Sequence, residues 1–231
     1  MDTDYTPGHY LVRLRNGENP PLSMNNPYLF QAARMTDELY TKPELEKSFP
    51  TIFNNPELPI IMEIGCYMGD TTVEIAQRNQ DINVLGVDIK YKRVVKSCYK
   101  IQRAKLTNAK IAIGDARELL SLVPDHSLYG IISFFPDPWQ KKRHKKKRFL
   151  NDGFFKNASA KLTDEGFIWI KTDSEAYYEE VRPILEKYNF TTRETLPRPL
   201  IGETHHTFFE QLFLQAGEPI YELFIYKIKP S

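Results

Sequence analysis

One short segment of the chain combines a carboxylate, an indole and two prolines that fix the backbone around them. It is Phe135-Pro136-Asp137-Pro138-Trp139, and it directly follows the apolar run at residues 129–134. That run has the length and the β-branched and aromatic content of a buried strand. The prolines end the strand, because proline fixes φ and lacks an amide donor. Asp137 is therefore predicted to stand on a rigid corner at the end of a strand.

A dense cationic run follows this corner. Seven formal positive charges and one histidine fall within residues 141–148, namely Lys141, Lys142, Arg143, His144, Lys145, Lys146, Lys147 and Arg148. The rest of the chain keeps 24 of the 31 basic residues against 30 acidic ones, although the net charge is +1. Such a concentrated field steers a polyanion and makes its binding salt-dependent. Most charge runs are only solvated, but the adjoining Asp137 and Trp139 favour an active site that faces a polyanion.

Apolar runs that alternate with amphipathic segments fill most of the chain beyond residue 57. Strands are expected at residues 58–64, 82–89, 109–113, 129–134, 166–172 and 220–228. Helices are expected at residues 71–79, 92–106, 152–162 and 175–188, with a short helix that contains Leu119, Leu120 and Val123. This alternation predicts βαβ units, and therefore an α/β fold with a doubly wound, mostly parallel sheet. Sites in such sheets lie beyond the carboxyl ends of the strands.

Carboxylates fall at five of these strand ends. They are Glu63, Asp88, Asp115, Asp137 and Asp173. One carboxylate there could be a helix cap, which is the structural alternative for Asp173. Five along successive strands are hard to assign to chance, and as a set they favour a ligand that is cationic and rich in hydroxyl groups.

The turn after the first of these strands narrows the kind of ligand. It runs from Gly65 to Asp70 and contains Gly69. The dinucleotide fingerprint Gly-x-Gly-x-x-Gly would need glycine where Tyr67 and Asp70 stand, and Asp70 at a helix start would repel a pyrophosphate. A nicotinamide cofactor is therefore excluded. S-adenosylmethionine instead offers a sulfonium, an amine, two ribose hydroxyls and an adenine. Asp88 is suited to the ribose, Asp115 to the adenine amino group and Glu63 to the cationic methionine end.

The sequence resembles the bacterial tRNA (guanine-N(7)-)-methyltransferase family over roughly residues 58–228. The resemblance rests on the strand ends, on FPDPWQKKRHKKKR, on KTDSEAYYEEV and on TFFEQLFLQAGEPIYEL. The first turn is common to methyltransferases at large, whereas the Phe-Pro-Asp-Pro-Trp-x-Lys-Lys-Arg-His block is highly specific. The resemblance implies a class I, Rossmann-like methyltransferase fold with seven strands, one of them an antiparallel C-terminal strand.

The resemblance also implies roles for individual residues. Glu63, Asp88, Asp115 and Asp137 match positions that bind the methyl donor, with Gly65 and Gly69 in its turn, and Asp137 is in addition the expected catalytic residue. Positions assigned to the RNA substrate match Lys141, Asp173, Thr207, Phe208, Phe209 and Glu210. The implied reaction is methyl transfer from S-adenosylmethionine to nitrogen 7 of a guanine in the variable loop of tRNA, which is a tRNA modification.

Two residues depart from the family pattern. The family usually has glycine where Tyr67 stands, so the turn against the donor is bulkier here. It usually has glutamate where Asp88 stands, which leaves a shorter arm toward the ribose. The Tyr67 change bears on the affinity for the donor and on the geometry of the turn.

The remaining features bound the setting of the protein. Residues 1–56 are expected to form a partly mobile N-terminal arm, with a short helix at residues 29–40, and residues 57–231 to form the methyltransferase domain. Two cysteines are too few for a disulfide framework, there is no secretory signal, and no apolar run is long enough to span a membrane. We expect a cytoplasmic monomer or homodimer with tRNA as its partner. Adjacent His205 and His206 lack further ligands at metal-site spacing, so no metal is expected.

Two alternatives remain open at this stage. One is a methyltransferase of the same fold that acts on a different substrate, for which the cationic run would be unnecessary. The other is an RNA-binding protein whose catalysis is impaired, for which Tyr67 is the concrete hint. Binding of the methyl donor discriminates between catalysis and binding alone.

Overall fold

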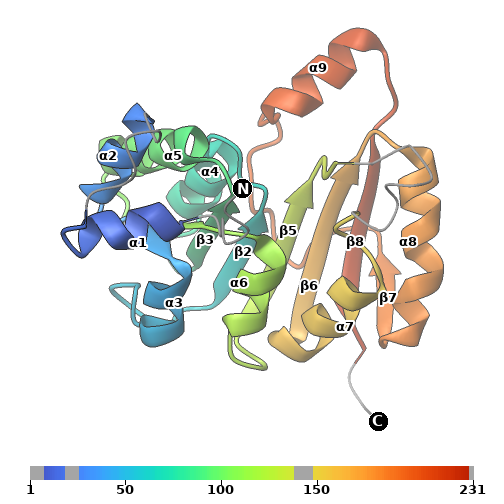
Figure 1. Ribbon diagram of the computed structural model, residues 1–231. Coiled ribbons are helices and arrows are strands. Elements are labelled where there is room, and N and C mark those ends of the chain that lie inside the picture. Colours follow the sequence, from blue (N-terminus) through green and yellow to red (C-terminus); the bar gives the residue numbers. More distant parts are fainter. Residues whose placement is uncertain (1–7, 19–25, 138–147, 229–231) are drawn as a thin grey trace, which may run out of the picture. The chain divides into compact units, whose positions relative to one another are not determined.

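The computed structural model describes residues 8–18, 26–137 and 148–228 (Figure 1). Trp139 and residues 141–147 of the cationic run lie outside this part of the chain. The chain divides into two compact units. The first comprises the described residues of 1–58 and 63–122, and the second those of 59–62 and 123–231.

The described residues form eight strands and nine helices. The strands are β1 (Leu39–Thr41), β2 (Ile60–Ile64), β3 (Asn83–Asp88), β4 (Ala109–Ile113), β5 (Leu128–Phe134), β6 (Leu162–Thr172), β7 (Phe190–Arg193) and β8 (Tyr221–Lys227). The helices are α1 (His9–Arg15), α2 (Pro27–Ala33), α3 (Lys42–Ser48), α4 (Asp70–Arg78), α5 (Tyr91–Ala104), α6 (Ala116–Leu122), α7 (Asp152–Lys161), α8 (Glu175–Lys187) and α9 (Phe208–Ala216).

The strands of the first unit are parallel and buried. The hydrogen-bonded order in this unit is β1-β4-β3, with Asp88 beside Ile113 at the carboxyl ends of β3 and β4, and the last two residues of β2, Glu63 and Ile64, also belong to it. Every residue of β2, β3 and β4 is buried. Continuous apolar runs of this kind are typical of parallel strands that are covered on both faces. Helices α4 and α5 pack on β3 and β4, and two of the predicted carboxylates, Asp88 and Asp115, lie at or just after the carboxyl ends of these strands.

The second unit contains the antiparallel part of the sheet. The order is β5-β6-β8-β7, with β5 and β6 parallel and β8 antiparallel to both β6 and β7. Helix α8 packs against β6, β7 and β8 (Figure 1). The predicted α/β class, the mostly parallel sheet and the antiparallel C-terminal strand are confirmed.

The number of strands and one helix were predicted wrongly. The described residues contain eight strands rather than seven, because β1 adds a strand that pairs with the outer side of β4. The helix expected at residues 29–40 ends at Ala33, and its second half is replaced by a turn and by β1. The three residues of β1 are too few for a periodic pattern, so their pairing with β4 decides their conformation.

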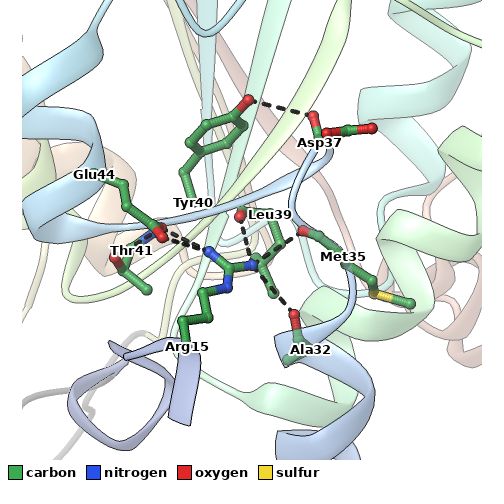
Figure 2. A network of polar contacts seen from close by, with 8 residues as sticks. All are labelled: Arg15, Ala32, Met35, Asp37, Leu39, Tyr40, Thr41 and Glu44. Atoms are coloured by element: carbon green, nitrogen blue, oxygen red, sulfur yellow. Dashed lines mark hydrogen bonds and ion pairs between the residues drawn. The ribbon is translucent and has the colours of Figure 1, made fainter. Parts of the chain in front are cut away.

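One arginine holds the N-terminal elements of the first unit together (Figure 2). The Nη1 group of Arg15 donates to both carboxylate oxygens of Glu44 at 2.7 and 2.8 Å, and Glu44 also accepts from the Thr41 amide at 2.7 Å. The Nη2 group donates to three backbone carbonyls, those of Ala32, Met35 and Leu39. Arg15 thus joins α1 to α2, β1 and α3. The boundary between an arm and a domain at residues 56 and 57 stays a prediction.

Candidate active site

The turn between β2 and α4 has an open, left-handed backbone. Gly65, Tyr67 and Gly69 have φ values of 76°, 51° and 74°. The amides of Gly65 and Cys66 both donate to the carbonyl oxygen of Val87 at 2.9 Å, which holds the turn against the end of β3. A Cβ atom at Gly65 would meet no atom within 4 Å. The turn therefore leaves room for a ligand to approach its backbone.

The other two positions of this turn show why it keeps its shape. A Cβ atom at Gly69 would lie 2.7 Å from Cβ of Ser97, so α4 can begin here only with glycine. Tyr67 adopts the left-handed conformation that glycine favours, at a cost of about 1–2 kcal/mol for a residue with a Cβ. The guanidinium of Arg93 lies 4.9 Å from the centre of the Tyr67 ring, a cation–π contact that offsets part of this cost. The bulkier residue is thus accommodated in the left-handed conformation that glycine favours.

Glu63 is a buried carboxylate at the end of β2. It is 4% exposed and accepts a short hydrogen bond from the Thr72 hydroxyl. Burial raises the pKa of Glu63 from 4.5 to about 7, against the hydrogen bond from Thr72, which lowers it, and with the charges of Asp70 and Asp88, which raise it. A buried carboxyl group whose pKa is raised in this way ionises most readily when a cation is bound beside it.

Asp88 and Asp115 stand at the ends of β3 and β4. Asp88 accepts from the Lys90 amide at 2.9 Å and from Arg93 at 3.3 Å, and its burial raises its pKa despite both contacts. Asp115 is half-buried and accepts from the Arg117 amide at 2.8 Å. The Gly114 amide donates to the carbonyl oxygen of Asp88 at 3.2 Å, which joins the two strand ends.

The first unit therefore brings together the predicted donor-binding residues that it contains. Glu63, Asp88 and Asp115 lie at the carboxyl ends of the neighbouring strands β2, β3 and β4, beside the glycine turn. Arg93, which pairs with Asp88, was not identified from the sequence. Its position five residues after Asp88 could have indicated this ion pair. A site with three carboxylates and an open backbone turn suits a ligand with a cationic group and several hydrogen-bond donors.

The predicted corner is present in the second unit. Phe135 follows β5 with a φ of 50°, and its amide donates to the carbonyl oxygen of Lys171 at 2.8 Å. A bulky residue in this conformation is strained, and such strain is concentrated at functional sites. Asp137 follows Pro136 and is exposed. The hydrogen bond to β6 thus fixes the position of the corner that carries Asp137.

A buried ion pair lies next to this corner. The Lys171 ammonium is 2.7 Å from Glu210 and 3.9 Å from Glu222, and the side chains of Lys171 and Glu210 are only 10% and 7% exposed. The ammonium also lies 5.2 Å from the centre of the Phe134 ring. Lys171 was not identified from the sequence. Its signal was a lysine directly after the apolar run at residues 167–170, but its partner is 39 residues away.

The residues predicted to bind RNA in the second unit have different surroundings. Glu210 accepts from the Thr207 amide and donates its own amide to the Thr207 hydroxyl, so these two residues form the N-terminal capping box of α9. Phe208 is 49% exposed, Phe209 is half-buried, and their rings meet edge to face. Asp173 is half-buried at the end of β6. Thr207 and Glu210 therefore position α9, while Phe208 and Asp173 keep accessible surface.

Arg148, the last residue of the cationic run, has the contacts of an anchoring residue. Its side chain is 6% exposed, pairs with Glu180, and lies 5.0 Å from the centre of the Tyr177 ring. The Tyr177 hydroxyl accepts from the Leu150 amide at 2.8 Å. These contacts fix the carboxyl end of the run on α8, and they differ from the phosphate contact expected of Arg148. Lys141 and the other members of the run lie outside the described residues.

Within the ranges that the structure covers, His, Cys, Asp and Glu side chains form no group of three or more that could hold a metal ion. In the same part of the chain, no helix combines the length and the apolar character needed to cross a membrane.

Comparisons of fold place the protein in a broad class. It is similar to the antibiotic-resistance methyltransferase Kmr, with a TM-score of 0.56 and 15% identity over 83% of this chain and 95% of that one. It is also similar to a Haemonchus contortus phosphoethanolamine N-methyltransferase solved with S-adenosyl-L-methionine, with a TM-score of 0.51 and 15% identity over 80% of this chain and 52% of that one. A family model described as "Putative methyltransferase" matches residues 57–223. The fold and the match define a methyltransferase of the Rossmann-like α/β type.

Similar sequences identify the family within this class. The chain is 35% identical to a tRNA (guanine-N(7)-)-methyltransferase of Actinobacillus succinogenes over 78% of this chain and 73% of that protein. It is 37% identical to a protein of the same name from Ureaplasma parvum, over 90% of this chain and 95% of that protein. The chain belongs to the tRNA (guanine-N(7)-)-methyltransferase family.

Proposed function

We propose that the protein transfers a methyl group from S-adenosylmethionine to nitrogen 7 of a guanine in the variable loop of tRNA. The observation that carries the proposal is the cluster of Glu63, Asp88 and Asp115 around the open glycine turn, in a chain of this family. The proposal includes action in the cytoplasm, as a monomer or homodimer, with no resident metal.

The donor site is built from the first unit. Glu63 would face the cationic methionine end, Asp88 the two ribose hydroxyls and Asp115 the adenine amino group. The open side of Gly65 fits a ligand that approaches the backbone closely. The donor supplies a methyl group on a positively charged sulfur, and it leaves as a neutral thioether.

The acceptor atom sets what the protein must do. Nitrogen 7 of guanine carries a lone pair and no proton, so the nitrogen–methyl bond forms while the sulfur–methyl bond breaks, and no proton has to leave the nucleophile. The positive charge moves from the sulfur to the purine. The residues therefore contribute by aligning the two reactants and by stabilising the charge that moves.

Asp137 is the residue proposed to stabilise the positive charge that develops on the purine. Two glutamates of the second unit are already engaged, since Glu210 pairs with Lys171 and Glu222 accepts from the Trp169 indole at 2.6 Å. Asp137 is exposed, on a corner that the Phe135 amide fixes to β6. Its carboxylate would accept from the Watson–Crick edge of the guanine and offset the positive charge on the methylated ring.

Donor binding tests the proposal against binding without catalysis. We expect S-adenosylmethionine to bind both the wild type and Tyr67→Gly, with dissociation constants within about threefold of each other, because Tyr67 already has the glycine-like backbone. Calorimetric titration measures this, and filter binding of an unmodified tRNA transcript serves as the parallel readout. A wild-type protein that binds the transcript but not the donor would support the RNA-binding alternative instead.

A further inference from the structure

A second stretch of the chain is strongly cationic and lies within the described residues. Residues 89–114 contain eight basic residues and no acidic one, namely Lys90, Lys92, Arg93, Lys96, Lys100, Arg103, Lys105 and Lys110. If this stretch and residues 141–148 are both set aside, the rest of the chain holds 16 of the 31 basic residues and all 30 acidic ones. Almost half of the positive charge is thus confined to two segments.

Helix α5 places three of these cations on one face. Lys92, Lys96 and Arg103 are spaced by four and seven residues, so they fall in one row along a helix about 21 Å long. All three are exposed, and none forms an ion pair with a carboxylate of the described residues. Tyr99, which is 47% exposed, lies between Lys96 and Arg103 in the sequence. Exposed cations and an aromatic ring form this surface, which we call the α5 face.

Three other cations of the stretch have structural partners. Arg93 pairs with Asp88 at 3.3 Å, and Lys100 pairs with Asp70 at 2.5 Å. Lys110 is buried and donates to the carbonyl oxygen of Asp37 at 2.6 Å. These contacts explain the charges of Arg93, Lys100 and Lys110 within the protein. The cations of the α5 face have no such explanation among the described residues.

The positions of the charges on α5 do not stabilise the helix. Its first turn contains no acidic residue and instead carries Lys92 and Arg93, where the positive end of the helix dipole disfavours cations. Lys92 and Lys96 are also like charges four residues apart, which destabilises a helix by a few tenths of a kcal/mol, in contrast to an opposite pair. Helix α8, by comparison, mixes four glutamates with Arg182 and Lys187. An external anion is the simplest physical reason for such an arrangement.

We propose that the α5 face, formed by Lys92, Lys96, Tyr99 and Arg103, binds the phosphate backbone of the tRNA substrate. The inference rests on the proposed function and adds a second cationic surface to the run at residues 141–148. Cations spaced one and two helical turns apart along one face can contact a phosphate backbone, and contacts of this kind position a nucleic acid without reading its sequence.

The test is a triple neutralisation, Lys92→Gln, Lys96→Gln and Arg103→Gln. We expect its affinity for an unmodified tRNA transcript at 0.1 M KCl to fall at least about tenfold, and the plot of log affinity against log salt to become less steep by about two. The affinity for S-adenosylmethionine and the rate at saturating tRNA should stay within about twofold of wild type, because phosphate contacts position the substrate and do not reach the reacting atoms.

A matched control separates the α5 face from net charge. Lys156→Gln, Arg182→Gln and Lys187→Gln, on α7 and α8, change the net charge by the same amount. An equal loss in both triple variants, or no loss in either, would overturn the inference. So would loss of binding to phosphatidylserine vesicles with tRNA binding intact, since the face would then be a membrane surface. A wild-type protein that binds no tRNA would instead refute the proposed function.

Discussion

Replacing Glu63 by glutamine is expected to stabilise the empty protein at alkaline pH and to weaken its binding of the methyl donor strongly. Glu63 is 4% exposed, and its burial raises its pKa from 4.5 to about 7. Above pH 7 the folded protein must hold a charge that water would solvate better. Glutamine keeps the shape and the hydrogen bond with Thr72 and removes that charge.

The direction of the pH dependence follows from the raised pKa. Between pH 4.5 and 7 the folded state binds a proton at Glu63 that the unfolded state has already released, so the free energy of unfolding falls as pH rises through this window. The full loss corresponds to about 3 kcal/mol and is complete above pH 7. Thermal unfolding at pH 5.5 and pH 8 should therefore show a larger gain for Glu63→Gln at pH 8.

Donor binding should change in the opposite sense. In the wild type, the affinity for S-adenosylmethionine should rise between pH 6 and 8, because Glu63 must ionise to face a cation. Glu63→Gln should lose this rise and bind at least about 100-fold more weakly at pH 8, a difference of about 2.7 kcal/mol. Calorimetry in buffers of different ionisation enthalpy would also show that the wild type releases a proton on binding.

The matched control is Asp70→Asn in the same turn. Asp70 is 52% exposed and pairs with Lys100 at the surface, so its loss should leave the affinity for the donor nearly unchanged at pH 8, where Glu63 is ionised with or without the charge of Asp70. If Glu63→Gln bound the donor as tightly as the wild type and melted with the same pH profile, the role given to Glu63 would be wrong.

The second large effect is expected at Asp137. Asp137→Asn should lower the rate of methyl transfer at saturating substrates by about 100- to 1000-fold, the usual loss when one group that stabilises moving charge is removed. The affinity for tRNA should stay within about threefold, because a carboxylate repels phosphates rather than holding them. Single-turnover transfer of labelled methyl, with filter binding of the same transcript, measures both quantities.

Asp164→Asn provides the comparison for this variant. Asp164 is a 61% exposed carboxylate of β6, away from the strand end that faces the corner. Its removal changes the net charge equally and should leave transfer at the wild-type rate. Retained turnover in Asp137→Asn would remove Asp137 from the catalytic role, and equal losses in both variants would point to net charge instead.

The strands that carry the site could be predicted because burial dictates their sequence. Strands β2, β3, β4 and β5 are mostly apolar runs that are followed by or end near a carboxylate or a proline corner, and these two signals pointed to Glu63, Asp88, Asp115 and Asp137. Strands β1 and β7 lacked this signal, since Leu39–Thr41 and Phe190–Arg193 are short and mixed in polarity. Their pairing with β4 and β8, which lie far away in the chain, decides their conformation.

Side-chain partners were predicted less well than positions. The ion pair of Lys171 with Glu210 and that of Arg148 with Glu180 join residues that are 39 and 32 positions apart. Nothing local in the sequence distinguishes a cation that will be buried against a glutamate from one that will face RNA. Arg148 shows this directly, because it ends a cationic run and is nevertheless anchored on α8.

The proposal that the protein methylates nitrogen 7 is tested most directly by one pair of tRNA transcripts. One transcript carries guanine at the variable-loop position, and the other carries 7-deazaguanine, which has the same Watson–Crick edge but a carbon in place of nitrogen 7. Both should bind equally, and labelled methyl from S-adenosylmethionine should reach one group per tRNA in the first and none in the second. Equal labelling of the two transcripts would contradict the assigned atom, and with it the reaction proposed for Glu63 and Asp137.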